Sequence, residues 1–296
     1  MHILAPAKIN LFLRIVGRRA DGYHLIDSFM VPVSLYDEIE ITADPVRGDR
    51  PCIRLSCNVP TLPTDESNLA YRAALAFCEE AKVAANIQIT LDKRIPSQAG
   101  LGGGSSDAAG VLRALNKILA VGFTPDKLSE IALCLGADVP FFIHGKPARV
   151  GGIGDVIAEI RDFPIRWVLI IVPDFSVPTP WAYAQFDKIG AAMRNASDSA
   201  RAPLAPGTWP ESSLFVNDLE SAVCPEYPTV AEIKEGLRLL GAEMALMSGS
   251  GSSVFGVFDS ERGARSAANA WTSSGNVARE IFVVRTSTDV PPAGNG

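Results

Sequence analysis

Residues 96–110, PSQAGLGGGSSDAAG, constrain the fold of this chain most, because five of these fifteen residues are glycine. The alternating residues 87–91 before the segment indicate a strand, and an apolar helical face follows from Ala108. Glycine lets a backbone approach a ligand closely, and the first N–H groups of a helix attract anions. The segment therefore predicts a phosphate-binding loop in which Ser105 or Ser106 caps the helix or binds phosphate. Taken alone, it could also be a tight turn without a ligand.

The spacing of the glycines excludes two common nucleotide-binding loops. A Walker A loop needs a lysine directly after its last glycine, and none follows Gly104. A dinucleotide fingerprint needs a third spaced glycine, where this chain has Ser105. What remains is the pattern Pro-x-x-x-Gly-Leu-Gly-x-x-Ser-Ser, so an NAD-dependent enzyme is disfavoured.

Strands and helices are mixed along the chain without a regular βαβ alternation, which favours an α+β fold with two lobes. We predict an N-terminal domain over residues 1–162, a C-terminal domain over 163–286 and a loose tail over 287–296. Residues 195–211 are polar and rich in proline and glycine, and they predict a long surface loop. The expected strands are 9–16, 38–42, 53–55, 87–91, 167–172, 254–258 and 281–284, and the expected helices are 67–83, 108–119, 125–135, 230–240 and 262–274.

Composition limits the possible partners and locations. A formal net charge of −6 argues against a nucleic-acid surface, although a small phosphate site needs only a few local donors. The five cysteines are scattered with no CxxC pair, and they are interpreted as core thiols in a reducing compartment. Neither a signal peptide nor a membrane-length apolar run is visible. We expect a cytoplasmic monomer or weak homodimer that binds small molecules and neither nucleic acid nor membrane.

Three motifs in order resemble those of the GHMP kinases: APAKINLFL at residues 5–13, the glycine loop, and MSGSGSSVF at 247–255. The resemblance implies a two-lobed fold with a mixed-sheet N-terminal domain and a smaller ferredoxin-like C-terminal domain. It also implies ATP as the phosphate donor, with Mg²⁺. No residue is assigned as a metal ligand, and Ser105, Ser106 and Asp107 are the nearest candidates.

Four further segments narrow the resemblance: DGYH at 21–24, KRIP at 93–96, LGADVPFF at 135–142 and VPTP at 177–180. They are similar to the members that phosphorylate the 2-hydroxyl of 4-diphosphocytidyl-2-C-methyl-D-erythritol (CDP-methylerythritol) in the non-mevalonate isoprenoid route. The alternative within the family is a kinase for homoserine, mevalonate or a sugar. A nucleotide-binding regulator without catalysis is a third possibility, but such a chain should have lost Lys8 or Asp138. The sequence departs from the resembled pattern at one position, since that family often has Asn after the paired serines where this chain has Asp107.

The resemblance also implies roles for individual residues. A lysine among apolar residues either extends along the surface or is held for function, and an aspartate after a helix is often a turn residue. The resemblance makes Asp138 the catalytic base and Lys8 its partner. Asn10 lies two residues from Lys8 on the same face of a strand, so we expect it to contact substrate. The resemblance places Tyr23 and His24 around the cytidine base with Thr179 nearby, Asn68 and Lys93 at the adenosine, and the ATP phosphates at Pro96, Ser97, Gln98, Ala99, Gly100, Leu101, Gly102, Gly103, Gly104, Ser105 and Ser106.

Overall fold

The computed structural model describes residues 1–48, 50–189, 207–210, 214–276 and 278–289. Most of the loop expected at 195–211, and most of the tail expected at 287–296, lie outside the described residues. No helix in the described part of the chain is long and apolar enough to cross a membrane.

A mixed sheet forms the N-terminal part of the molecule. Its strands follow the order β3-β4-β2-β5-β6, and β1 pairs antiparallel along β2. Only the β3–β4 pair is parallel among these pairings. The strands are β1 (His2–Arg18), β2 (His24–Pro45), β3 (Cys52–Cys57), β4 (Ala85–Asp92), β5 (Ala148–Gly152) and β6 (Val156–Glu159).

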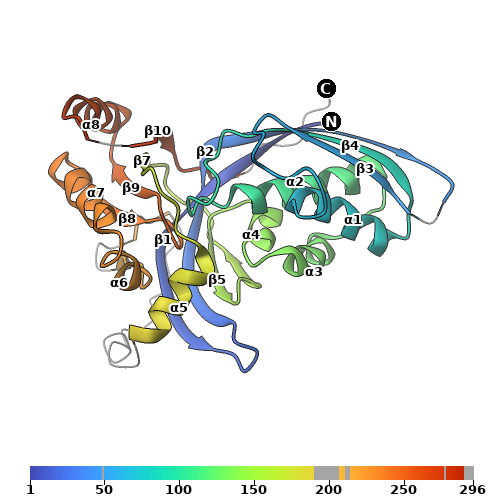
Figure 1. The fold of residues 1–296 in the computed structure, drawn as a ribbon, viewed down its shortest axis with the longest axis horizontal. Coiled ribbons are helices and arrows are strands. Elements are labelled where there is room, and N and C mark those ends of the chain that lie inside the picture. The colour runs from blue at the N-terminus through green and yellow to red at the C-terminus, as the bar shows by residue number, and fades with distance from the viewer. Residues whose placement is uncertain (49, 190–206, 211–213, 277, 290–296) are drawn as a thin grey trace.

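Four helices gather on one side of the long β1–β2 ribbon (Figure 1). Helix α2, which follows the glycine loop, contacts β1, β2 and the other three helices. Its buried face includes Val111, Leu112 and Leu115, as the helical periodicity predicted. The helices are α1 (Leu69–Ala81), α2 (Gly103–Ile118), α3 (Pro125–Leu135) and α4 (Val139–His144).

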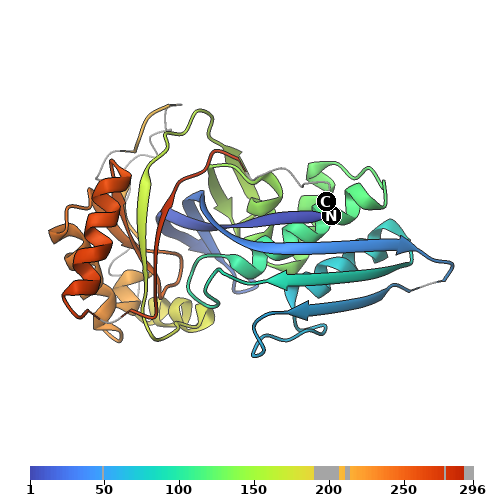
Figure 2. The ribbon, with the colours of Figure 1, turned by 90° about the horizontal axis from the view of Figure 1, so that it is seen from above.

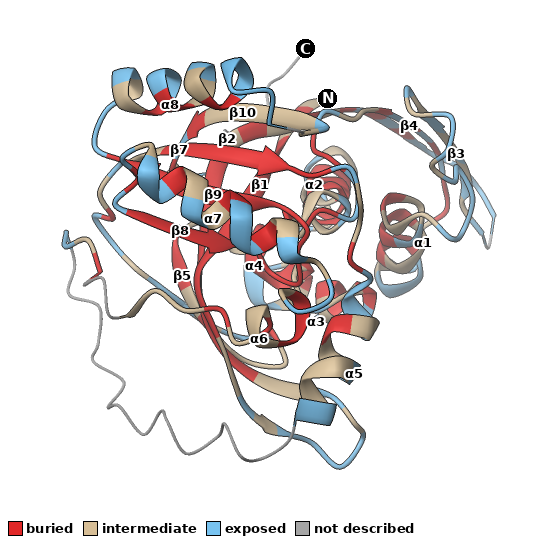
Figure 3. Cartoon of the chain, turned by 60° about the vertical axis from the view of Figure 1, so that its left-hand side comes forward, coloured by how far each residue is buried: buried red, intermediate tan, exposed pale blue. Residues whose placement is uncertain are grey.

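A second, antiparallel sheet of order β10-β7-β9-β8 forms the C-terminal part. Its chain order is β-α-β-β-α-β, which is ferredoxin-like. Strands β7, β8 and β9 are buried, whereas α7 and α8 expose their outer faces (Figure 3). The elements are β7 (Trp167–Val172), α5 (Thr179–Ile189), α6 (Glu220–Val223), α7 (Pro228–Leu239), β8 (Met244–Met247), β9 (Val254–Phe258), α8 (Glu261–Ser273) and β10 (Glu280–Arg285). The domain boundary at residue 162 stays a prediction.

An apolar core joins the two sheets. Ile9 on β1 and Phe29 on β2 pack in one buried cluster with Ile170 and Phe255 of the C-terminal sheet. Because side chains alternate along a strand, Lys8 and Asn10 point to the opposite face of β1 from Ile9. Figure 2 shows the long β1–β2 ribbon running from beside the C-terminal sheet across the helices of the N-terminal part. The C-terminal sheet therefore covers the face of β1 that carries Ile9, whereas the face that carries Lys8 turns toward the glycine loop and α4.

The expected core role of the cysteines is wrong for most of them. Only Cys78 is buried; Cys52 and Cys134 are exposed, and the remaining two are partly exposed. Cys52 begins an edge strand, and Cys134 lies off the face of α3 that buries Leu128 and Ile131. Scattered cysteines without a partner motif do not reveal which face of an element they occupy.

Candidate active site

The glycine loop turns where only glycine is tolerated. Gly100 and Gly102 have φ values of +75° and +73°, which side chains disfavour. A Cβ on Gly100 would lie 2.0 Å from the carbonyl oxygen of Ser248, and one on Gly102 would lie 2.9 Å from the ring of Phe142. The bare backbone therefore lets the loop pack against both the C-terminal part and α4.

Neither serine of the loop caps the following helix, so that part of the prediction is wrong. Helix α2 begins at Gly103, and its N-cap is Gly102, which makes no side-chain capping bond. The left-handed turn at Gly102 starts the helix early and places Ser105 and Ser106 inside its first turn. Ser106 is buried and its hydroxyl has no hydrogen-bond partner in the structure. Ser105 lines the cavity beside the loop, whereas the unpartnered hydroxyl of Ser106 is enclosed by protein.

A single cavity of about 1040 Å³ receives side chains from both parts of the molecule. Ser106 alone among the predicted site residues does not line it. The predicted residues that do are Lys8, Asn10, Tyr23, His24, Asn68, Lys93, Pro96, Ser97, Gln98, Ala99, Gly100, Leu101, Gly102, Gly103, Gly104, Ser105, Asp138 and Thr179.

Strand β1 holds Lys8 directly beside the loop. The backbone N–H of Lys8 donates to the carbonyl of Leu101 at 2.9 Å. Its Nζ donates to Oδ1 of Asn10 at 2.6 Å and lies 3.6 Å from Oδ2 of Asp138. The amide of Asn10 donates in turn to the buried hydroxyl of Ser28 at 2.8 Å. This chain of bonds fixes the amide of Asn10 with its oxygen toward the ammonium.

Asp138 presents its carboxylate to this ammonium from the start of α4. It occupies the N-cap position but makes no capping bond, so its oxygens remain free to face Lys8. The side chain of Asp138 is 32% exposed, whereas that of Lys8 is only 3% exposed. Burial, and then the charge of Asp138, raise the pKa of Tyr183, which therefore stays a neutral phenol beside the carboxylate.

The third glycine-rich motif completes the wall of the cavity. The hydroxyl of Ser248 donates to the carbonyl of Gly100 at 2.9 Å, and the hydroxyls of Ser250 and Thr179 lie 2.7 Å apart. A Cβ on Gly249 would lie 3.0 Å from Nζ of Lys8. The three motifs of the sequence thus meet at one place.

The expected base-binding residues line the cavity beside the turn that joins β1 to β2, which we call the hairpin end of the cavity. Tyr23 is 60% exposed. Nε2 of His24 lies 2.8 Å from Oδ1 of Asp187, and its ring centroid lies 4.8 Å from that of Tyr183. Sequence reasoning missed Tyr183 and Asp187. Their spacing after Thr179, at four and eight residues along α5, is the signal that could have found them.

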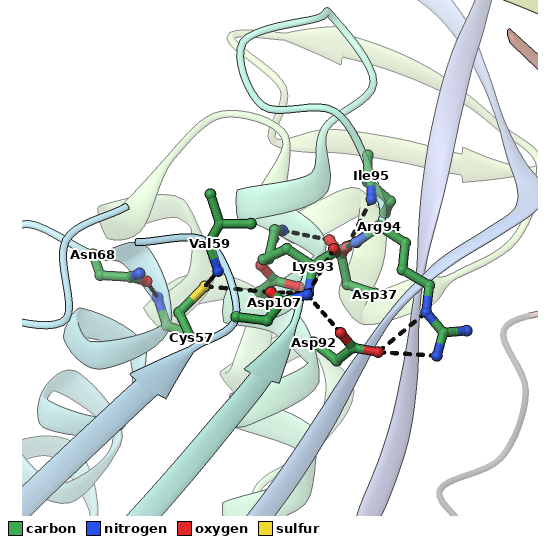
Figure 4. A network of polar contacts seen from close by, with 11 residues as sticks. Asp37, Cys57, Val59, Asn68, Asp92, Lys93, Arg94, Ile95 and Asp107 are labelled. Carbon is green, nitrogen blue, oxygen red and sulfur yellow. Dashed lines mark hydrogen bonds and ion pairs between the residues drawn. The ribbon is translucent and has the colours of Figure 1, made fainter. Parts of the chain in front are cut away.

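The two residues predicted for the adenosine already have protein partners. Asn68 is the N-cap of α1, where it accepts from the N–H of Ala70 at 2.9 Å and donates to the carbonyl of Pro63 at 2.8 Å. Lys93 lies between the carboxylates of Asp37 and Asp107 (Figure 4). Sequence reasoning missed Asp37 altogether. Contacts of Asn68 and Lys93 with a nucleotide stay a prediction.

A glycine-rich loop that opens a helix, with a lysine facing an aspartate beside it, is the arrangement expected of a small-molecule phosphotransferase. Two family models match the chain: "GHMP kinases N terminal domain" over residues 68–146 and "GHMP kinases C terminal" over residues 208–277. The chain belongs to the GHMP kinases, and the α+β, two-lobed fold implied by the sequence motifs is confirmed. Membership of this family implies the use of ATP.

The curated relatives narrow the likeness further. A protein of Citrifermentans bemidjiense named 4-diphosphocytidyl-2-C-methyl-D-erythritol kinase is 43% identical over 269 residues, which are 90% of this chain and 93% of the relative. One of the same name from Syntrophotalea carbinolica is 44% identical over 90% of this chain and 92% of its own length. A crystal structure of 4-(cytidine 5'-diphospho)-2C-methyl-D-erythritol kinase superposes with a TM-score of 0.72 at 34% identity, covering 97% of this chain and 99% of that one.

Proposed function

We propose that this chain transfers the γ-phosphoryl group of ATP to the 2-hydroxyl of CDP-methylerythritol, in the non-mevalonate route to isoprenoid precursors. The observation that carries the proposal is the Lys8–Asp138 pair, with Nζ 3.6 Å from Oδ2, beside the glycine loop. The curated relatives supply the identity of the acceptor, because they are named as that kinase and are similar to this chain over nine-tenths of its length.

The chemistry follows from how phosphoryl transfer is catalysed. Its transition state is loose, so positioning and stabilisation of charge do most of the work. Asp138 accepts the proton of the attacking hydroxyl as the bond to phosphorus forms. Lys8, held by Asn10, keeps a fixed positive charge beside the carboxylate and the transferred group. The N–H groups at the start of α2 bind the phosphates of ATP.

Mg²⁺ belongs to the proposal as the partner of ATP. The ion neutralises charge on the phosphates during transfer. The hydroxyls of Ser105 and Ser106 would hold it together with phosphate oxygens, and the buried, unpartnered Oγ of Ser106 fits that role. No group of three or more His, Cys, Asp or Glu side chains within the described residues is placed to hold a metal ion.

The hairpin end of the cavity suits a planar, polar base. The rings of His24 and Tyr183 offer stacking surfaces, and Tyr23 adds an exposed aromatic ring beside them. Thr179 lies between this end and the third motif, where it can contact the diphosphate or the sugar alcohol. The cavity would thus hold the acceptor at one end and ATP at the other, with Lys8 and Asp138 between them.

The direct test incubates the protein with ATP, Mg²⁺ and CDP-methylerythritol. We expect a product heavier by one phosphoryl group, with a new phosphomonoester signal in the ³¹P spectrum. Homoserine, mevalonate and galactose serve as competing acceptors, and phosphorylation of one of these instead would replace the proposed acceptor. Size-exclusion chromatography and cell fractionation would test the proposed monomer or weak homodimer and its cytoplasmic location.

A further inference from the structure

Three buried charged residues stand beside the glycine loop without a role in the proposed chemistry. Asp37 is fully buried on β2, Lys93 follows β4, and Asp107 lies on α2 just after its first turn. Their side chains are 0%, 6% and 4% exposed. Buried charges are costly unless they are paired, so this cluster requires a structural or functional reason.

The contacts of the cluster join the two ends of the loop. Lys93 stands three residues before Pro96, where the glycine segment begins, and Asp107 directly follows the paired serines. Nζ of Lys93 donates to Oδ2 of Asp107 at 2.5 Å and pairs with Oδ2 of Asp37. Oδ1 of Asp37 accepts the backbone N–H groups of Arg94 at 2.6 Å and Ile95 at 2.8 Å. One lysine thus fastens the start of the loop to the helix that ends it (Figure 4).

The arrangement leaves Lys93 little capacity for ATP. Two carboxylates face its ammonium, and the side chain is almost completely enclosed. By contrast, Nζ of Lys8 has one neutral amide and one partly exposed carboxylate for partners. The cluster also contains two carboxylates for one ammonium group. Its charge is therefore not one that would attract the phosphates of ATP.

We propose that Asp37, Lys93 and Asp107 form a clasp that holds the glycine loop in its phosphate-binding shape, and that Lys93 acts as a positioning residue and not as a phosphate ligand. The backbone N–H groups of the loop can bind phosphates only if both ends of the loop stay at the right separation. The clasp sets that separation before ATP arrives. This inference rests on the proposed use of the cavity for ATP.

A pair of substitutions at Asp107 isolates the clasp bond from the charge. Asp107→Asn and Asp107→Ala both remove the negative charge, but only asparagine keeps an oxygen that can accept from Lys93. In the protein without nucleotide, we expect Asp107→Ala to speed amide hydrogen exchange across residues 94–106 by about tenfold. We expect its dissociation constant for ATP to rise by about tenfold as well, whereas Asp107→Asn stays within about threefold of the natural protein in both measurements.

The partly exposed Lys127 provides a matched control, because it also lies between two carboxylates, those of Glu80 and Glu130. Lys127→Met should alter neither exchange in the loop nor ATP binding, whereas Lys93→Met should alter both. Unfolding midpoints of all four variants separate loosening of the loop from general loss of stability. Should Lys93→Met not fold, the comparison of the two Asp107 variants decides alone.

Two outcomes would overturn the clasp. If both Asp107 variants bind ATP equally weakly while exchange in the loop stays unchanged, the charge of Asp107 acts on the nucleotide or its metal. If Asp107→Ala changes neither amide exchange in the loop nor ATP binding, the bond between Asp107 and Lys93 does not maintain the shape of the loop. Failure of the natural protein to bind ATP would instead contradict the proposed function, and the exchange measurements would still decide the shape of the loop.

Discussion

Two lysines line the same cavity, and their surroundings differ in the property that matters for chemistry. Lys8 has one neutral amide partner, and its carboxylate partner Asp138 is 32% exposed. Lys93 is enclosed between two buried carboxylates. The carboxylate of Asp138, which faces Lys8, stays open to a substrate. The charge of Lys93, by contrast, is satisfied by carboxylates within the protein. A lysine in a cavity therefore indicates catalysis only when its protein partners leave room for a substrate to contact it or its partner.

The largest effect in this comparison of Lys8 with Lys93 is expected from a substitution of Asp138, the carboxylate partner of Lys8. Asp138→Asn keeps the size of the side chain but removes the base, so we expect kcat to fall by about 10²–10⁴-fold. Steady-state kinetics with ATP and CDP-methylerythritol measure this effect. The affinity for ATP should change little, because the loop does not depend on Asp138. A kcat near that of the natural protein, with the fold unchanged, would remove Asp138 from the mechanism.

The second prediction concerns Lys8 itself. Lys8→Met retains the apolar stem and removes the charge beside the transferred group, so we expect kcat to fall by about 10²–10³-fold. Single-turnover kinetics at saturating ATP separate this effect from binding. A variant that weakened ATP binding while leaving the chemical step intact would show that Lys8 binds ATP and does not act in the chemical step.

The third prediction concerns the clasp and pH. Burial raises the pKa of Asp107 to about 7, although the charge of Lys93 opposes this shift. The carboxyl group has a pKa of about 3.9 in an unfolded chain, so the folded protein binds this proton more tightly. The resulting stabilisation is complete below about pH 4 and is lost as the pH rises through about 7.

Urea unfolding of the natural protein and Asp107→Asn between pH 4 and pH 8 would measure this contribution. The natural protein should lose stability relative to the variant as the pH rises, because asparagine does not titrate. Parallel curves for the two proteins across this range would contradict the raised pKa of Asp107.

The smallest effect is expected at the hairpin end. Asp187→Asn removes the charge that faces both His24 and Arg18, but it keeps a group that can hydrogen-bond. We expect KM for CDP-methylerythritol to rise by about two- to tenfold with kcat almost unchanged, because His24 would be oriented less firmly. An equal loss of kcat would instead place Asp187 closer to the reaction.

Parts of the site could be predicted because local sequence determines them. The shared face of Lys8 and Asn10 follows from the alternation of a strand, and the bounds expected for 167–172 and 254–258 match β7 and β9. The extents of β1 and β2 were underestimated because a run of residues within each strand is buried on both faces, which hides the alternation there. The short α4, and α5, which buries only Ala182, gave too little periodicity to be found.

The sequence by itself determined the three motifs, the order of the main elements and the membership of the GHMP kinases, because these depend on residue type and spacing along the chain. Only the tertiary structure decided what each charged residue faces. Asp37 lies 56 residues from Lys93, and Asp187 lies 163 residues from His24. Such pairs depend on how strands and helices pack, which local periodicity does not encode. The structure thereby separates Lys8, which faces the proposed reaction, from Lys93, which holds the loop.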